Sequence, residues 1–316
     1  MAKQSAEAGA RPIRDGAARP AGLFVGLTTL DTIYLVRRPP EPDEKIVAED
    51  LVVAAGGPAT GAAVAFAHLG GRATLVSAVG SGPLAAAAQE DLATLGIRHH
   101  DLRPGEPILP VSAIMVNAAG GERAVVSAHG ALPGAAPAAA GAARALLAGA
   151  DVVLVDGHQL DVAVDVLGSA GRAPVVFDGG SWKPGTERLL PHVDVALCGN
   201  AFRPPGVGGG DPDGVLRYLL ARGPSFAAVT HGPGPIRWAT AHAGGEIRPP
   251  AVRAVDTLGA GDVFHGAFAW SIAVLPRLTT AGMVAALAAA SQVAARSVTR
   301  FGTRSWLAQD VETPTS

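Results

Sequence analysis

AVDTLGAGDVFHGAFAWSIA, residues 254–273, is the stretch from which the rest of this chain is best interpreted. Its centre is a turn of small residues that ends in one acid and is followed by an apolar run typical of a helix. These residues are Gly259, Ala260, Gly261 and Asp262. Glycine lets the backbone pass close to a ligand, and a helix N-terminus presents unpaired N–H groups at the positive end of its dipole. The stretch therefore predicts an anion-binding site at a helix start.

The composition favours one large globular unit and a small-molecule partner. With 316 residues, 48% hydrophobic and 16% charged, the chain is able to bury an extensive core. A net charge of −2 gives no electrostatic reason to expect nucleic acid or an anionic membrane surface as a partner. The single cysteine, Cys198, excludes an internal disulfide and fits a reducing compartment, so we expect a cytoplasmic protein.

No segment has the properties of a membrane span or a signal peptide. Residues 51–71 and 278–295 lack charge, but glycine and proline interrupt the first, and the second is mostly alanine with polar residues inside it. The first 20 residues have no apolar core and are rich in Ala, Gly, Arg and Pro. We expect a disordered leader over 1–20, one domain over 21–307 and a polar tail over 308–316.

From residue 135 onward, helical and strand patterns alternate, which indicates an α/β fold with a parallel sheet covered by helices on both faces. Several of the predicted strands end in polar residues or glycine. Because the carboxyl ends of parallel strands meet at one edge of the sheet, these residues predict a cleft. They are Asp156, His158, Asp178, Gly179, Gly199, Asn200, Thr230 and Gly232.

The N-terminal part predicts a second group of site residues. The apolar segment 21–30 has the character of a buried strand broken by Gly26, and it ends just before Asp31. An acid at a strand end is placed either to face a substrate or to be a solvated turn carboxylate. The Gly56–Gly57 pair feeds a helix and permits close approach to a ligand, although an ordinary strand-to-helix turn explains the pair equally simply.

Two segments predict strands that leave the main sheet. Residues 32–54 mix β-branched residues with a cluster of Pro and charge, and residues 107–129 have the pattern of a hairpin that turns at 118–121. Together they form a candidate β-strand lid.

Several alternative chemistries lack their motifs. The chain has no GxxxxGK[ST] loop. Gly259 and Gly261 begin a GxGxxG match, but Phe264 occupies its third glycine position, which argues against a nicotinamide oxidoreductase. Lys183 replaces the second glycine that a nucleophile elbow requires. Neither an HExxH run nor a cysteine pair suggests zinc.

The sequence VDTLGAGDVFHGAF resembles the second signature of the PfkB, or ribokinase-like, carbohydrate kinases. The resemblance runs along most of the chain and implies a three-layer α/β sandwich with a mostly parallel central sheet and a small β lid. It also implies that Asp262 is the catalytic base and that Gly259, Ala260 and Gly261 form the anion hole for the transferred phosphoryl group. We expect the helix N-terminus to lower the pKa of Asp262 below the ordinary value of about 3.9. The simpler alternative for Asp262 is a helix cap.

The resemblance implies further binding residues. Those that would hold the sugar are Asp31, Gly56 and Gly57, with Asn117 and His158 as further groups that decide the substrate. Those that would contact ATP are Asn200, Thr230, Gly232 and Gly234, with Asn200 near the phosphates and Mg²⁺. A K⁺ ion held in the loops of Asp256 and Gly302 is a further expectation.

Three departures from the family pattern put parts of this assignment in doubt. Gly61 stands where many members carry a sugar-binding Asn, and Gly82 and Ala85 replace an acid and a glycine of a G-x-D-x-x-G motif that begins at Gly80. Arg203 occupies the glutamate position of an N-x-x-E motif, which changes how Mg²⁺ would be held. Its guanidinium is expected either to contact nucleotide phosphates or to be solvated.

The sequence therefore predicts an ATP-dependent kinase that phosphorylates a primary hydroxyl of a small sugar. The motifs VGLTTLDTIYLV, GGPA, SAIMV and DVFHGA are most similar to the ketohexokinase and sulfofructose kinase neighbourhood, which favours a ketohexose or a related monosaccharide. A ribokinase or nucleoside kinase of the same family, and a sugar sensor without turnover, remain alternatives. Lid strands in this family often pair between subunits, so a homodimer is expected.

Overall fold

The computed structural model describes residues 19–128, 135–169, 171 and 173–311. Most of the predicted leader, residues 1–18, and the end of the predicted tail, residues 312–316, lie outside the described residues. A 3-10 segment, Ser305–Val311, extends into the described part of the predicted tail.

A nine-stranded sheet forms the centre of the molecule, and its order confirms the predicted α/β fold. Seven strands are parallel, and an antiparallel pair that the sequence pattern did not predict continues one edge. The strand order is β13 (Gly244–Ile247), β12 (Ile236–Thr240), β11 (Phe226–Thr230), β10 (Val195–Gly199), β9 (Val175–Gly179), β8 (Val152–Val155), β1 (Ala21–Val25), β4 (Arg72–Ser77) and β5 (Arg98–Asp101).

Helices cover both faces of this sheet because its buried strands are apolar on both sides. In β1, Phe24 packs into one hydrophobic core, whereas Leu23 and Val25 pack into the other, as the alternation of side chains along a strand requires. The first core lies under α1 (Pro58–His68), α2 (Pro83–Thr94), α6 (Ala260–Ala273) and α7 (Thr280–Ser297). The second lies under α3 (Pro137–Leu146), α4 (Leu160–Leu167) and α5 (Pro212–Leu220), with 3-10 turns at Leu147–Gly149, Thr186–Arg188 and Leu190–His192.

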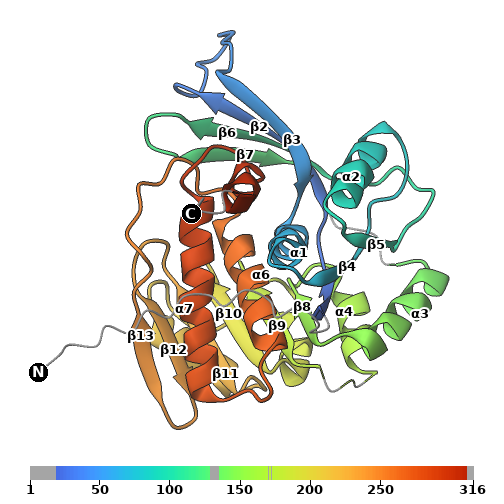
Figure 1. The fold of residues 1–316 in the computed structure, drawn as a ribbon, viewed down its shortest axis with the longest axis vertical. Coiled ribbons are helices and arrows are strands. Elements are labelled where there is room, and N and C mark those ends of the chain that lie inside the picture. The colour runs from blue at the N-terminus through green and yellow to red at the C-terminus, as the bar shows by residue number, and fades with distance from the viewer. Residues whose placement is uncertain (1–18, 129–134, 170, 172, 312–316) are drawn as a thin grey trace, which may run out of the picture.

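A separate four-stranded sheet stands beyond the large sheet and corresponds to the predicted lid (Figure 1). Its inner face buries Ile33, Ile114 and Val116 against Leu258 and Phe301. The lid therefore packs on the segment that precedes α6 and on the segment that follows α7. The lid strands, in spatial order, are β3 (Asp50–Gly56), β2 (Thr29–Val36), β6 (Val111–Asn117) and β7 (Arg123–Ser127).

The order of the large sheet reverses between β1 and β8. The chain proceeds from β1 to β4 on one side, and from β8 through β9 and β10 to β11 on the other. Ligands of open α/β sheets bind beyond the carboxyl ends of the strands at such a switch point. The fold therefore places a binding site where β1 and β8 end.

Candidate active site

Helix α6 begins at the small-residue turn, as predicted. Gly259 precedes the helix with φ of 73°, a left-handed conformation that favours glycine. The first helical hydrogen bond runs from the Val263 N–H to the Gly259 carbonyl at 2.9 Å. The N–H groups of Gly261 and Asp262 precede that bond and lie at the open end of the helix, where an anion binds most favourably.

One pocket brings the two predicted halves of the site together. It encloses about 490 Å³, part of it open to solvent, and Asp262 and Gly259 face Asp31 and the Gly56–Gly57 turn across it. Its other lining residues are Ala55, Gly61, Val64, Leu258, Val263, Ser297, Thr303, Arg304 and Trp306.

Asp31 reaches this pocket from a different element than predicted. Strand β1 ends at Val25, and Asp31 is the third residue of the lid strand β2. Its carboxylate accepts a hydrogen bond from the Thr29 hydroxyl at 2.6 Å. Burial raises the pKa of Asp31, although the hydrogen bonds with Thr29 and Ser112 act to lower it. A Cβ at Gly56 would overlap the Asp31 carboxylate, so Gly56 is required for this approach.

Asp156 fixes the Gly56–Gly57 turn at the switch point of the sheet. Its buried carboxylate accepts the N–H groups of Leu27 at 2.9 Å, Ala59 at 3.1 Å and His158 at 2.8 Å. Burial alone would raise the pKa of Asp156, but His158 and the backbone donors outweigh it and lower the pKa to about 2. One ionised side chain thus ties together the ends of β1 and β8 and the start of α1.

Asp262 lies in an environment opposite to the one expected from its helix position. Its pKa is raised well above the ordinary value, first by burial and then by the charges of Asp178, Asp31 and Asp156. Only Arg123, on lid strand β7, acts in the other direction among the main causes. Our expectation of a lowered pKa was wrong, because desolvation and three nearby carboxylates exceed the effect of a helix end.

The packing around the pocket explains why residue 61 is a glycine. A Cβ at residue 61 would lie 2.6 Å from the Asp262 Cβ and 2.9 Å from its Oδ2. Any side chain there would therefore displace the acid or the helix that carries it. The departure from the family pattern leaves room for Asp262.

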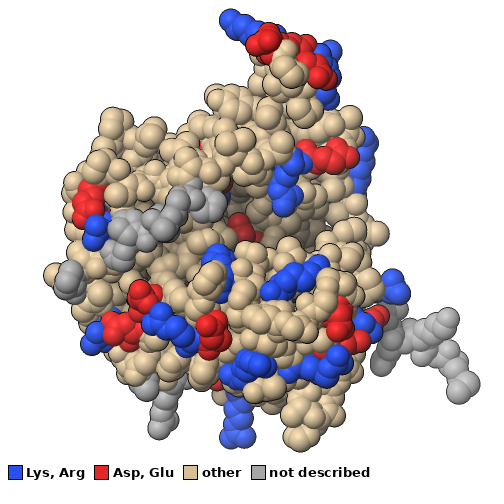
Figure 2. Space-filling model, turned by 180° about the vertical axis from the view of Figure 1, so that it is seen from behind, with Lys and Arg blue, Asp and Glu red and all other residues tan. Residues whose placement is uncertain are grey.

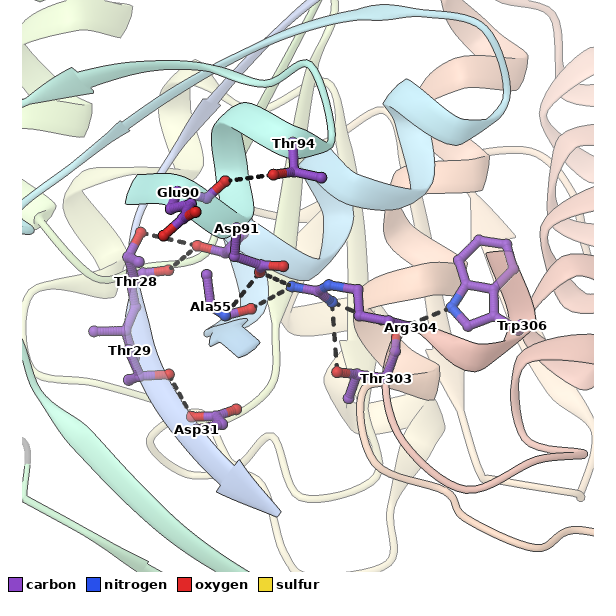
Figure 3. A network of polar contacts seen from close by, with 12 residues as sticks. Thr28, Thr29, Asp31, Ala55, Glu90, Asp91, Thr94, Thr303, Arg304 and Trp306 are labelled. Carbon is purple, nitrogen blue, oxygen red and sulfur yellow. Dashed lines mark hydrogen bonds and ion pairs between the residues drawn. The ribbon is translucent and has the colours of Figure 1, made fainter. Parts of the chain in front are cut away.

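Arg304 is a pocket residue that the sequence did not reveal. Figure 3 shows its guanidinium between Ala55 and Asp91. It donates to the Ala55 carbonyl at 2.5 Å and to the Asp91 carboxylate at 3.0 Å, while Asp91 accepts the Ala55 N–H at 2.9 Å. The residue before Gly56 is thereby held from both sides. The only sequence signal was an arginine in the turn that contains Gly302.

The predicted K⁺ residues lie together beside the pocket. The Asp256 carboxylate accepts the N–H groups of Leu258 at 2.9 Å and Gly302 at 3.0 Å. The Gly302 carbonyl, one of the predicted ligand groups, accepts the Ser305 hydroxyl at 3.1 Å. Among the described residues, no cluster of three or more His, Cys, Asp or Glu side chains is arranged to hold a metal ion.

The predicted nucleotide residues form a separate group at the ends of β10 and β11. Gly199 pairs with Thr230 in the sheet, which places the neighbouring Asn200 beside the turn that follows Thr230. Gly232 has φ of 52°, and the Gly234 N–H closes the turn on the His231 carbonyl at 2.9 Å. None of these residues lines the pocket of Asp262.

Three other predicted residues are placed by local contacts. The Asn117 side-chain oxygen accepts the Ala119 N–H at 2.9 Å and stabilises the lid hairpin turn, away from the pocket lining. His158 lies 3.2 Å from the Asp156 carboxylate at the end of β8. The exposed Arg203 guanidinium donates to the Asn200 and Phe202 carbonyls.

The lid contacts the anion-binding turn through Arg123, which the sequence did not reveal. Its guanidinium donates to the Thr257 hydroxyl at 2.8 Å, two residues before Gly259. Seen from behind, the molecule is hollowed between the lid and the large sheet, with acidic side chains at the floor and basic ones beside it (Figure 2). The site is therefore an acidic cavity that a lid arginine faces.

Comparison with known proteins identifies the family of this chain. The model of the pfkB family of carbohydrate kinases matches residues 23–309. The chain belongs to this family. It is a sugar kinase with the ribokinase-like fold, and the predicted identification is confirmed.

Relatives include ribokinases and fructokinases. The Bacillus subtilis (strain 168) ribokinase is 25% identical over 281 residues, which cover 88% of this chain and 92% of that protein. The structure of a proposed ribokinase from Agrobacterium tumefaciens is 29% identical with a TM-score of 0.77, covering 94% and 100% of the two chains. The Xylella fastidiosa fructokinase with bound ATP, at 20% identity, covers 90% and 94% with a TM-score of 0.70 and supports the fold alone.

No helix among the described residues is long and apolar enough to cross a membrane.

Proposed function

We propose that this kinase transfers the terminal phosphoryl group of ATP to a primary hydroxyl of a small sugar, most suitably a ketohexose or a related monosaccharide. The observation that carries the proposal is the single pocket in which Asp262 and the open end of α6 face Asp31 and the Gly56–Gly57 turn. A base, an anion site and hydroxyl-binding groups then surround one reacting oxygen.

Each group has a distinct role in the proposed reaction. Asp31 and the backbone at Gly56 and Gly57 bind sugar hydroxyls and orient the acceptor. Asp262 accepts the proton of that hydroxyl as its oxygen attacks the phosphorus atom. The N–H groups at Gly261 and Asp262 stabilise the charge that develops on the transferred phosphoryl oxygens.

ATP fits the ends of β10 and β11, where Asn200, Thr230 and the tight turn at Gly232 and Gly234 expose backbone groups. Because Arg203 bonds to the Asn200 and Phe202 carbonyls, it does not reproduce the glutamate of the family pattern. Mg²⁺ bound to the ATP phosphates would neutralise their charge.

A sugar panel tests the substrate. ADP release is measured with fructose, other ketohexoses, ribose and adenosine in the presence of ATP and Mg²⁺. We expect the highest kcat/KM with a ketohexose, whereas turnover of ribose or adenosine alone would support the ribokinase or nucleoside kinase alternative. Sugar-dependent thermal stabilisation without ADP release under any nucleotide would instead indicate a sensor.

The variant Asp262→Asn tests the base. It preserves size and helix position but accepts no proton, so kcat should fall about 100- to 10,000-fold on any sugar that is turned over. Retention of most of the activity would refute the assignment. Sugar binding, measured by calorimetry, serves as the control because Asp31 and the glycine turn remain intact.

We also propose that two lids pair in a homodimer. The outer face of the lid exposes apolar side chains on three strands: Tyr34, Leu51, Val53 and Val126, of which Val126 is 70% exposed. The lid edges β3 and β7 are free to pair in the described chain. Sedimentation of the wild type against Val126→Lys tests the proposal, with a monomeric wild type as the contrary result.

A further inference from the structure

His265 lies directly beneath the anion-binding turn, and no role follows for it from the proposed reaction. The side chain is 4% exposed, between α6 and the large sheet. Its Nδ1 lies 2.6 Å from the Gly261 carbonyl in its own helix, and its Nε2 lies 3.1 Å from the Leu197 carbonyl on β10. Both ring nitrogens therefore face carbonyl oxygens.

Two carbonyl partners require two N–H donors. A neutral imidazole has one N–H and one lone pair, so one of these contacts would oppose two lone pairs. Only the imidazolium satisfies both. A buried cation needs a counter-charge, and the Asp178 carboxylate lies 3.3 Å from Nδ1 and is also buried.

The sheet register places this counter-charge beside the second carbonyl. Asp178 on β9 is the neighbour of Leu197 on β10, so the imidazole of His265 contacts both residues. Asp178 Oδ2 has no hydrogen-bond partner among the described residues, as expected for an oxygen whose compensation is a neighbouring charge. Burial raises the pKa of Asp178, and His265 opposes this rise.

The Gly261 carbonyl matters because it shares a planar peptide with the Asp262 N–H. A hydrogen bond that fixes the carbonyl on the sheet side also fixes the N–H on the pocket side. We propose that doubly protonated His265 is a positioning residue that locks the Gly261–Asp262 peptide of the anion hole against β10, with Asp178 as its counter-ion. This inference rests on the proposed function for its catalytic consequence, but not for its protonation state.

The pair also sets the charge felt by the base. Asp178 is the largest charged cause of the raised pKa of Asp262. A cationic His265 compensates the charge of Asp178. The other groups whose charges reach Asp178 and Asp262 are Asp31, Arg123, Asp156, His158 and Lys183, and Cys198 lies beside Asp178.

Two variants with opposite charge effects test the proposal. His265→Gln leaves a neutral side chain, so kcat should fall about 10- to 100-fold, less than for loss of a direct anion-hole donor, with little change in KM. The acidic limb of the kcat profile should move to higher pH in this variant, because the charge of Asp178 on Asp262 is then uncompensated. Asp178→Asn should move the acidic limb to lower pH. His242→Gln, at an exposed turn, is the matched control.

A merely structural role would lower stability without moving the acidic limb in opposite directions in the two variants. If a folded His265→Gln enzyme, verified by circular dichroism and thermal melting, keeps the wild-type kcat and pH profile, the proposal is wrong.

Nitrogen NMR of the wild type labelled with ¹⁵N-histidine tests the protonation state without any substrate. We expect one buried histidine with both ring nitrogens protonated at the pH of maximal activity, identified by its response to Asp178→Asn. A neutral tautomer of His265 at that pH would overturn the proposal even if His265→Gln fails to fold. If no sugar is phosphorylated, the proposed function fails while this measurement still decides the state of His265.

Discussion

Gly61→Ala should lower the activity of the kinase strongly while leaving it folded. Residue 61 is in the second turn of α1, and its added Cβ would lie 2.6 Å from the Asp262 Cβ. Carbon atoms in contact are separated by about 3.5 Å or more. The two helices must therefore separate by about 0.9 Å at this point, or Asp262 must turn away.

The packing between α1 and α6 leaves little room for this shift. On the other side of the contact, a Cβ at Gly266 of α6 would overlap the Ala62 carbonyl, so the backbones already touch through glycine. A displacement of about 1 Å of a reacting group costs about 100-fold in rate. We expect kcat/KM to fall about 10- to 100-fold in the assay of ADP release.

The effect on stability should be small by comparison. Replacing glycine by alanine inside a helix contributes about 0.5–1 kcal/mol, which offsets part of the 1–3 kcal/mol expected from overpacking. Gly141→Ala is the matched control, because Gly141 is also near the start of a helix and a Cβ there meets nothing within 4 Å. It should raise the melting temperature by about 1–3 °C without loss of activity. A Gly61→Ala enzyme with wild-type kcat/KM would refute the packing argument.

Three further predictions concern the surroundings of the pocket. The pKa of Asp156, about 2 in the folded state, is below the ordinary value of about 3.9, so its contribution to stability is present above pH 4 and is lost as the pH falls toward 2. Urea unfolding should show wild type losing about 2 kcal/mol over that range, and Asp156→Asn should be less stable at pH 7 with a flatter pH dependence. Arg304→Gln removes the guanidinium that holds the Ala55 carbonyl and pairs with Asp91, so the KM for sugar should rise about 10-fold in steady-state kinetics; an unchanged KM would contradict a role in holding the glycine turn. If the loops of Asp256 and Gly302 bind K⁺, replacing K⁺ with tetramethylammonium should lower kcat severalfold, and equal rates in both salts would exclude the ion.

The sequence predicted the elements whose causes are local. A buried parallel strand is an apolar run, and α6 starts where Gly259 adopts a left-handed conformation, so both were recognisable from short segments. The antiparallel pair β12 and β13 was missed because its strands are short and one begins with two glycines. Asp31 was assigned to the wrong element because β1 and β2 are separated by only three residues.

The environment of the site could not be predicted from local patterns. Arg304 contacts Ala55 across 249 positions, and His265 contacts Leu197 across 68. No sequence motif predicts either contact. The direction of the pKa shift of Asp262 likewise depends on burial and on carboxylates from β2, β8 and β9, which only the fold brings together.

The carboxylates that line the cavity or lie buried near it differ in charge state, for reasons that suit a base. Asp156 is stabilised as an anion by three backbone N–H groups, whereas Asp31, Asp178 and Asp262 are buried with raised pKa values. A general base becomes more effective as its pKa approaches the working pH, provided that it remains largely ionised. The raised pKa of Asp262 thus makes it a stronger base than an exposed aspartate. Since Arg123 from the lid acts against the rise, closure of the lid over the turn would favour the ionised form at the moment when the sugar hydroxyl must lose its proton.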